Sequence, residues 1–129
     1  EGTWIFKRNG VYYLTYPDNH GGNGNRMKYA TSDSPLGPWE YQDVFLDSTG
    51  CDTSHGSVVE YKGDWYLFYH NKAISGTGNL RSVCVDKLEF DENGKILMVE
   101  QTLDSVEPVG PRVEPSEDMV TYQADEAEL

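Results

Sequence analysis

One strand–turn–strand pattern occurs twice in this chain. The sequence Tyr-Leu-x-Tyr starts at Tyr13 and again at Tyr66, an offset of 53 residues, and a turn that contains glycine precedes each copy. A repeat of about fifty residues built from short strands is typical of the blades of a β-propeller. A propeller needs at least about four blades to close its ring. The sequence therefore predicts an all-β fold with two blades, which is an incomplete propeller.

Each repeat contains four segments with the composition and alternation of half-buried strands. Turns rich in glycine, asparagine and proline separate these segments. The expected strands of the first repeat are residues 3–8, 11–16, 26–31 and 40–46, and those of the second repeat are residues 57–61, 64–69, 80–86 and 95–101. We therefore expect residues 1–102 to form two four-stranded antiparallel blades.

The strand pattern ends after residue 102. Residues 103–119 contain three prolines and scattered charges, so they are predicted to be a linker. Residues 104–129 carry eight acidic residues against one arginine, which is −7 of the total net charge of −12. Such an acidic chain repels phosphate backbones, so nucleic acid is not expected as a partner. No apolar run reaches the roughly 18 residues of a transmembrane helix, so no membrane is expected either.

The common short motifs of catalysis and cofactor binding are missing from the sequence. It contains no CxxC pair, no HExxH, no GxxxxGK and no GxSxG. These spacings are typical of zinc sites, phosphate-binding loops and nucleophilic serines. The remaining side chains that can carry chemistry are carboxylates, three histidines and many aromatic residues.

Four longer segments follow one another in a fixed order. They are residues 1–16 (EGTWIFKRNGVYYLTY), 29–39 (YATSDSPLGPW), 55–71 (HGSVVEYKGDWYLFYHN) and 81–86 (RSVCVD). Together they resemble the corresponding segments of glycoside hydrolase family 43. The resemblance implies a five-bladed β-propeller of which this chain supplies the last two blades. It also implies an inverting hydrolase that acts on plant cell-wall polysaccharides or oligosaccharides rich in arabinose or xylose, such as arabinan, xylan and arabinoxylan.

An inverting glycosidase needs two carboxyl groups about 6.5–9.5 Å apart, one as general acid and one as general base. By resemblance, Glu1 corresponds to the general acid. The alternative is that Glu1 is only a solvated carboxylate at the end of the chain. The family places the general base and a third carboxylate on N-terminal blades that this sequence does not contain, so those blades are expected partners. The isolated chain is therefore expected to be inactive.

The resemblance also suggests residues that contact the substrate. His55 corresponds to a histidine near the propeller axis, often next to a calcium ion held mostly by water. The alternative is a histidine that only forms hydrogen bonds, and no cofactor is required for the reaction. Arg81 opens a strand, where it is expected to bind a sugar hydroxyl or to hold a catalytic carboxylate. Asn19 lies in a polar loop rich in amides and is expected to bind sugar hydroxyls together with His55. A surface arginine paired with Asp86 or Glu89 is the alternative for Arg81.

The end of the chain suggests a further domain. Residues 120–129 are similar to the first strand of a family 6 carbohydrate-binding module, a β-sandwich. The family resemblance also implies a secreted or periplasmic location. Three alternatives to the hydrolase remain. They are a non-catalytic carbohydrate-binding propeller, a complete domain built by pairing two copies of this chain, and an enzyme that cleaves sucrose or fructan. The last of these typically has Glu-Cys where this chain has Glu1 and Gly2.

Overall fold

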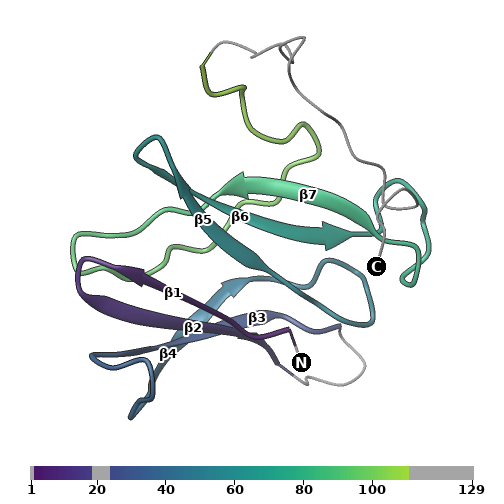
Figure 1. Ribbon diagram of the computed structural model, residues 1–129. Helices are drawn as coiled ribbons and strands as arrows, with labels where there is room; N and C mark the ends of the chain where they lie inside the picture. Colours follow the sequence, from purple (N-terminus) through teal and green to yellow (C-terminus); the bar gives the residue numbers. More distant parts are fainter. Residues whose placement is uncertain (1, 19–23, 111–129) are drawn as a thin grey trace, which may run out of the picture.

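The computed structural model describes residues 2–18 and 24–110, which form two antiparallel β-sheets and no helix (Figure 1). This confirms the all-β fold, and this part of the chain has no helix that could cross a membrane. The strands of the first sheet, in spatial order, are β1 (Trp4–Arg8), β2 (Val11–Pro17), β3 (Met27–Ser32) and β4 (Glu40–Leu46). Those of the second sheet are β5 (Ser57–Tyr61), β6 (Asp64–Asn71) and β7 (Ser82–Lys87).

The first hairpin of each sheet closes with the same two-residue turn. Asn9 and Gly10, between β1 and β2, have φ angles of 48° and 80°. Lys62 and Gly63, between β5 and β6, have φ angles of 50° and 86°. Two successive residues with positive φ form the tight turn whose twist matches that of the flanking strands. The repeat in the sequence is therefore also a repeat in the structure.

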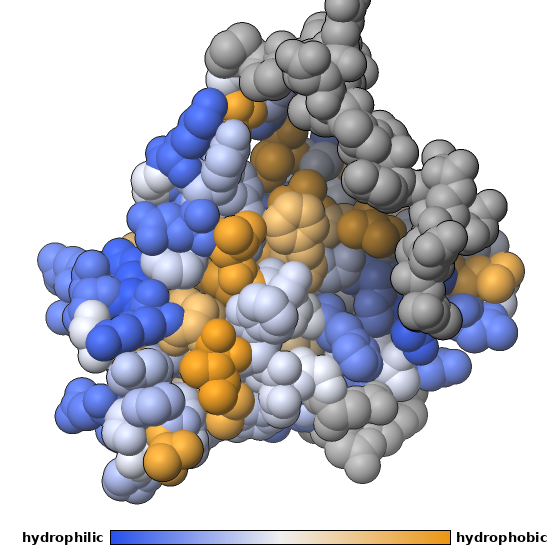
Figure 2. Space-filling model, viewed as in Figure 1, coloured by the Kyte–Doolittle hydropathy of each residue, from blue (hydrophilic) through white to orange (hydrophobic). Residues whose placement is uncertain are grey.

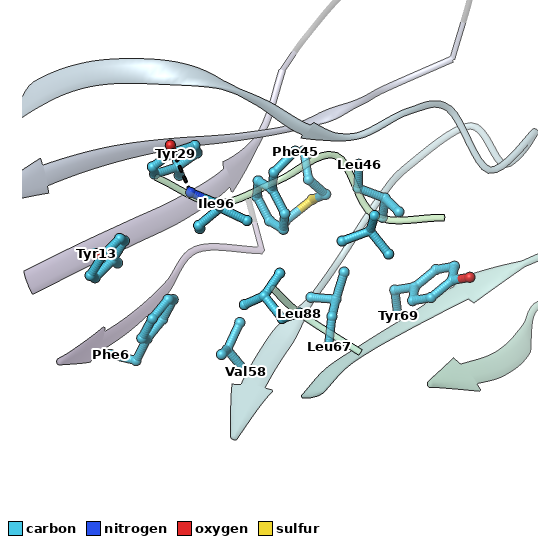
Figure 3. Close-up of a cluster of buried hydrophobic side chains, with 12 residues drawn as sticks. Phe6, Tyr13, Tyr29, Phe45, Leu46, Val58, Leu67, Tyr69, Leu88 and Ile96 are labelled. Atoms are coloured by element: carbon cyan, nitrogen blue, oxygen red, sulfur yellow. Dashed lines mark hydrogen bonds between the residues drawn. The ribbon is translucent and has the colours of Figure 1, made fainter. Parts of the chain in front are cut away.

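The two sheets stack face to face and share one hydrophobic core (Figure 3). The rings of Phe6 in β1 and Tyr13 in β2 stack with centroids 4.8 Å apart, and Trp65 of β6 packs against Phe6 at 5.3 Å. The indole nitrogen of Trp4 donates a hydrogen bond to the carbonyl of Val58 at 3.2 Å, which joins β1 to β5. The buried core consists of Phe6, Tyr13, Met27, Tyr29, Phe45, Leu46, Val58, Leu67, Tyr69, Leu88, Ile96 and Val99.

The prediction of an eighth strand at residues 95–101 is wrong, and within the described residues the second sheet has three strands. Ile96 forms only an isolated antiparallel bridge with Phe90. Farther along, the backbone N–H of Val99 donates to the carbonyl of Phe45 in β4 at 2.8 Å. The segment therefore crosses to the first sheet and does not extend the second.

Burial of two apolar side chains explains this path. Ile96 and Val99 are three residues apart and only 5% and 6% exposed, whereas Met98 between them is 57% exposed. A regular strand would turn Ile96 and Val99 to opposite faces, so both could not enter the same core. The backbone N–H of Ile96 donates instead to the hydroxyl of Tyr29 at 3.1 Å (Figure 3).

Large apolar side chains also remain on the surface of both sheets. Ile5 in β1 is 48% exposed, Val59 in β5 is 45% exposed and Val83 in β7 is 84% exposed. Figure 2 shows hydrophobic residues gathered over the middle of one face, between hydrophilic ones. Contiguous apolar surface of this kind marks contact with other protein surfaces. The outer faces of these sheets are thus suited to contact with further blades.

We expect Tyr29→Phe to destabilise the fold by about 1–3 kcal/mol, because it leaves the buried N–H of Ile96 without an acceptor. Urea denaturation monitored by circular dichroism measures this loss. Tyr41→Phe is the matched control, since Tyr41 lies in the same sheet and is 54% exposed. Equal losses for the two variants would contradict the role of the Tyr29 hydroxyl.

Candidate functional site

A groove lies where the first strands of the two sheets begin. It has a volume of about 360 Å³ and takes its walls from both sheets. Its lining residues are Gly2, Thr3 and Trp4 from the first sheet, and His55, Gly56, Ser57, Phe68, Tyr69, His70 and Val83 from the second.

Gly2 lies close to the second side of the groove. A Cβ atom on Gly2 would lie 3.0 Å from Cγ and Nδ1 of His55 and 3.2 Å from the carbonyl oxygen of Ser54. The φ angle of Gly2 is +64°, a conformation that glycine adopts readily. Glu1, the expected general acid, lies outside the described residues, but its peptide bond joins it to Gly2 at the edge of the groove.

The structure brings His55 and Arg81 to the same end of the second sheet. His55 is exposed in the groove, and its ring centroid lies 6.2 Å from that of His70. Arg81 is also exposed, and its Nη2 donates a hydrogen bond to Oγ1 of Thr53 at 2.8 Å. None of the ion pairs in the described part of the chain involves Arg81. Asn19, the third expected sugar-binding residue, lies outside the described residues.

His70 also lines the groove and makes a hydrogen bond beside it. Its Nε2 lies 2.9 Å from the carbonyl oxygen of Thr53. A carbonyl can only accept, so Nε2 carries the proton and Nδ1 is the free acceptor of a neutral ring. His70 lies near the end of β6, and the antiparallel pairing brings this end level with the start of β5, which His55 precedes. Pairing of the two expected strands could have indicated this proximity from the sequence.

Burial lowers the pKa of His70. The hydrogen bond to Thr53 raises this pKa, while electrostatic interaction with Arg81 and His55 lowers it further. The net pKa lies below the ordinary value of about 6.5, so His70 is neutral near pH 7. A neutral imidazole can hold Thr53 without adding charge to the groove.

Asp18, which follows β2, is a buried carboxylate at the same end of the first sheet. The backbone N–H of Arg26 donates to it at 2.7 Å, its guanidinium at 2.9 and 3.1 Å, and the Lys28 ammonium lies 3.4 Å away. Burial acts to raise the pKa of Asp18, but these partners outweigh it and the pKa is lowered. The contacts with Arg26 and Lys28 stabilise the ionised form of this buried carboxylate.

The side chains at the groove do not by themselves fit a calcium ion. In the part of the chain that the structure describes, no group of three or more His, Cys, Asp or Glu residues could hold a metal. Calcium prefers six to eight oxygen ligands, whereas His55 would offer one nitrogen.

Residues 1–96 match the sequence profile of glycosyl hydrolases family 43. A xylosidase/arabinosidase from Bacteroides ovatus is 42% identical over 101 residues, and a β-xylosidase from Xylanibacter ruminicola is 44% identical over 100 residues. A β-xylosidase/α-arabinofuranosidase from a compost microbial metagenome, solved in complex with xylotriose in a calcium-free form, is 42% identical with a TM-score of 0.67. The chain belongs to glycoside hydrolase family 43, and its two sheets are blades of the family's β-propeller.

The similarity covers most of this chain and a smaller part of each related protein. The two bacterial relatives align with 78% and 77% of this chain, which corresponds to 30% of the length of each of them. The metagenomic structure covers 74% of this chain, and 28% of that structure is covered in return. The chain therefore spans less than a third of the length of the curated relatives that it matches.

We expect protonation of His70 to destabilise the folded chain. Because the pKa of His70 is lowered in the folded state, its contribution to stability is complete above about pH 6.5 and is lost as the pH falls through the folded-state pKa. His70→Gln removes this contribution and keeps an N–H donor. The urea midpoint of the wild type should therefore fall relative to that of His70→Gln as the pH drops below about 6.5. A difference that stays constant with pH would contradict the prediction.

Proposed function

We propose that this chain forms one side of the active-site funnel of an inverting xylosidase or arabinofuranosidase, and that Glu1 is the general acid. The observation that carries the proposal is the position of Gly2. Gly2 lines the groove between the first strands of the two sheets and packs against His55. Glu1 is bonded to Gly2, and the proposal uses its carboxyl group as the proton donor to a sugar bound in the funnel.

In this proposal Glu1 protonates the glycosidic oxygen as the bond to the sugar breaks. A general base on the opposite side of the sugar activates water, with the two carboxyl groups about 6.5–9.5 Å apart so that the water fits. We place this base, and a third carboxylate that keeps the pKa of the acid raised, on blades outside this chain. The apolar outer faces of the two sheets, with Ile5 and Val83 exposed, support contact with such blades.

The proposed substrates are xylose- or arabinose-containing polysaccharides and oligosaccharides of plant cell walls. The names of the two bacterial relatives and the xylotriose bound by the metagenomic enzyme support this class. His55 is exposed in the groove, and Arg81 is exposed nearby, where it contacts Thr53; both can donate hydrogen bonds to sugar hydroxyls. We propose Asn19 as a further contact, from the polar loop after β2.

The remaining parts of the proposal concern the whole protein. Polymeric substrates of this size stay outside cells, so we propose a secreted or periplasmic enzyme. We also propose that residues 103–119 link the propeller to a carbohydrate-binding module that begins near residue 120. Any calcium ion near His55 would need oxygen ligands from water or from the other blades.

Glu1→Gln in the complete enzyme tests the general acid. With a substrate whose leaving group is a poor one, such as a sugar hydroxyl, kcat/KM should fall by roughly 10²–10⁴-fold. With a dinitrophenolate leaving group the loss should be small, because this group departs without a proton. Equal losses for the two substrates would remove Glu1 from the acid role, whereas no turnover by the complete wild-type protein would favour a non-catalytic carbohydrate-binding propeller.

The isolated chain should not hydrolyse aryl xylosides or arabinofuranosides, because the proposal places the general base on other blades. Release of nitrophenol by the purified chain, compared with the complete enzyme at equal molar concentration, is the measurement. A rate that tracks the chain through purification and is abolished by Glu1→Gln would show that the chain holds a base of its own.

A further inference from the structure

The loop of residues 53–55, which precedes β5, is held by side chains from three other segments. Thr53 accepts two hydrogen bonds: its carbonyl lies 2.9 Å from Nε2 of His70 in β6, and its hydroxyl accepts from Nη2 of Arg81 at 2.8 Å. The hydroxyl of Ser54 donates to the carbonyl of Asn25, before β3, at 2.8 Å. We call residues 53–55 the support loop.

The support loop is more firmly fixed than an ordinary surface connection. Ser54 is 2% exposed, and its bond to Asn25 ties the loop to the first sheet, whereas His70 and Arg81 tie it to the second. Side chains that meet from separate segments restrict a loop far more than its own backbone does. The two sheets are therefore connected here by polar contacts, in addition to the hydrophobic core.

Ser54 and His55 of the support loop lie next to Gly2. The carbonyl oxygen of Ser54 and the ring of His55 both lie within contact distance of a Cβ at Gly2, at 3.2 and 3.0 Å. A side chain at position 2 would collide with both groups, so the backbone of Gly2 runs close to the loop here. The loop thus limits the position of the backbone that carries residue 1.

We infer that His70 and Arg81, by holding Thr53, fix the position of Gly2, the residue to which the proposed general acid is bonded. This inference rests on the proposed function of Glu1 as general acid. In it His70 and Thr53 are positioning residues that touch no substrate, and Arg81 has a structural contact besides any contact with sugar. A shift of about 1 Å in a catalytic group can lower the rate roughly 100-fold, so small movements of this loop matter.

The experiment compares two leaving groups in the complete enzyme, a sugar hydroxyl and dinitrophenolate. His70→Leu removes the hydrogen bond to the Thr53 carbonyl, and His70→Gln restores an N–H donor at a similar distance. Thr53→Val removes only the hydroxyl that Arg81 contacts, and it covers the case in which His70→Leu does not fold. Thr31→Val is the matched control, because its hydroxyl also accepts one hydrogen bond, from Gln42 at 2.9 Å, outside the groove.

We expect His70→Leu to lower kcat by about 10- to 100-fold with the sugar leaving group and by less than about threefold with dinitrophenolate. Thr53→Val should show the same selectivity with a smaller loss, and His70→Gln should recover most of the rate. Thr31→Val should show no selectivity. Equal losses for both leaving groups in His70→Leu and Thr53→Val would mean a general structural role and would overturn the inference.

A second measurement separates this inference from the proposed role of Glu1. Hydrogen exchange of the Gly2 and His55 amides should accelerate in His70→Leu and Thr53→Val and remain unchanged in Thr31→Val. If Glu1→Gln shows no leaving-group selectivity, the proposed function fails, and the exchange data alone then decide whether the loop holds Gly2. Unchanged exchange at Gly2 in both loop variants overturns the positioning of this backbone.

Discussion

The contact between the two sheets is the constraint on which the rest of this structure depends. Aromatic rings from β1, β2 and β6 fill the space between the sheets, with Phe6 stacked on Tyr13 and Trp65 packed against it. Burial of rings of this size contributes more to the fold than any single hydrogen bond. It also fixes how β1 and β5 lie against each other, and the groove exists only because these two first strands start side by side.

The segment after β7 shows how strongly this core governs the path of the chain. A fourth strand would have covered the free edge of β7, but residues 95–101 place Ile96 and Val99 between the sheets instead. The backbone N–H groups of this segment find acceptors outside the second sheet: the Tyr29 hydroxyl accepts from Ile96, and the Phe45 carbonyl accepts from Val99. The apolar core and the polar backbone are thus satisfied together, as buried segments require.

The groove combines two kinds of interaction with different consequences for function. Its shape follows from the packing of the sheets, which tolerates little movement. The polar contacts of Thr53 and Ser54 add a local restraint at the point where Gly2 meets the second sheet. An acid in a glycosidase must lie within hydrogen-bond distance of its leaving oxygen, so a rigid attachment point favours the chemistry. The support loop offers such an attachment to residue 1.

The sequence by itself determined the repeat, the seven strands that form and the family to which the chain belongs. These features depend on local alternation, on two-residue turns such as Asn9-Gly10, and on motifs of adjacent residues. It did not reveal the path of residues 95–101, because four consecutive apolar residues fit a strand and a core segment equally well. Nor did it show that His70 and Arg81 meet at Thr53. Only the tertiary structure decided these points, since the hydrogen bonds of Thr53 join positions 17 and 28 residues apart and arise from the alignment of strand ends within the second sheet.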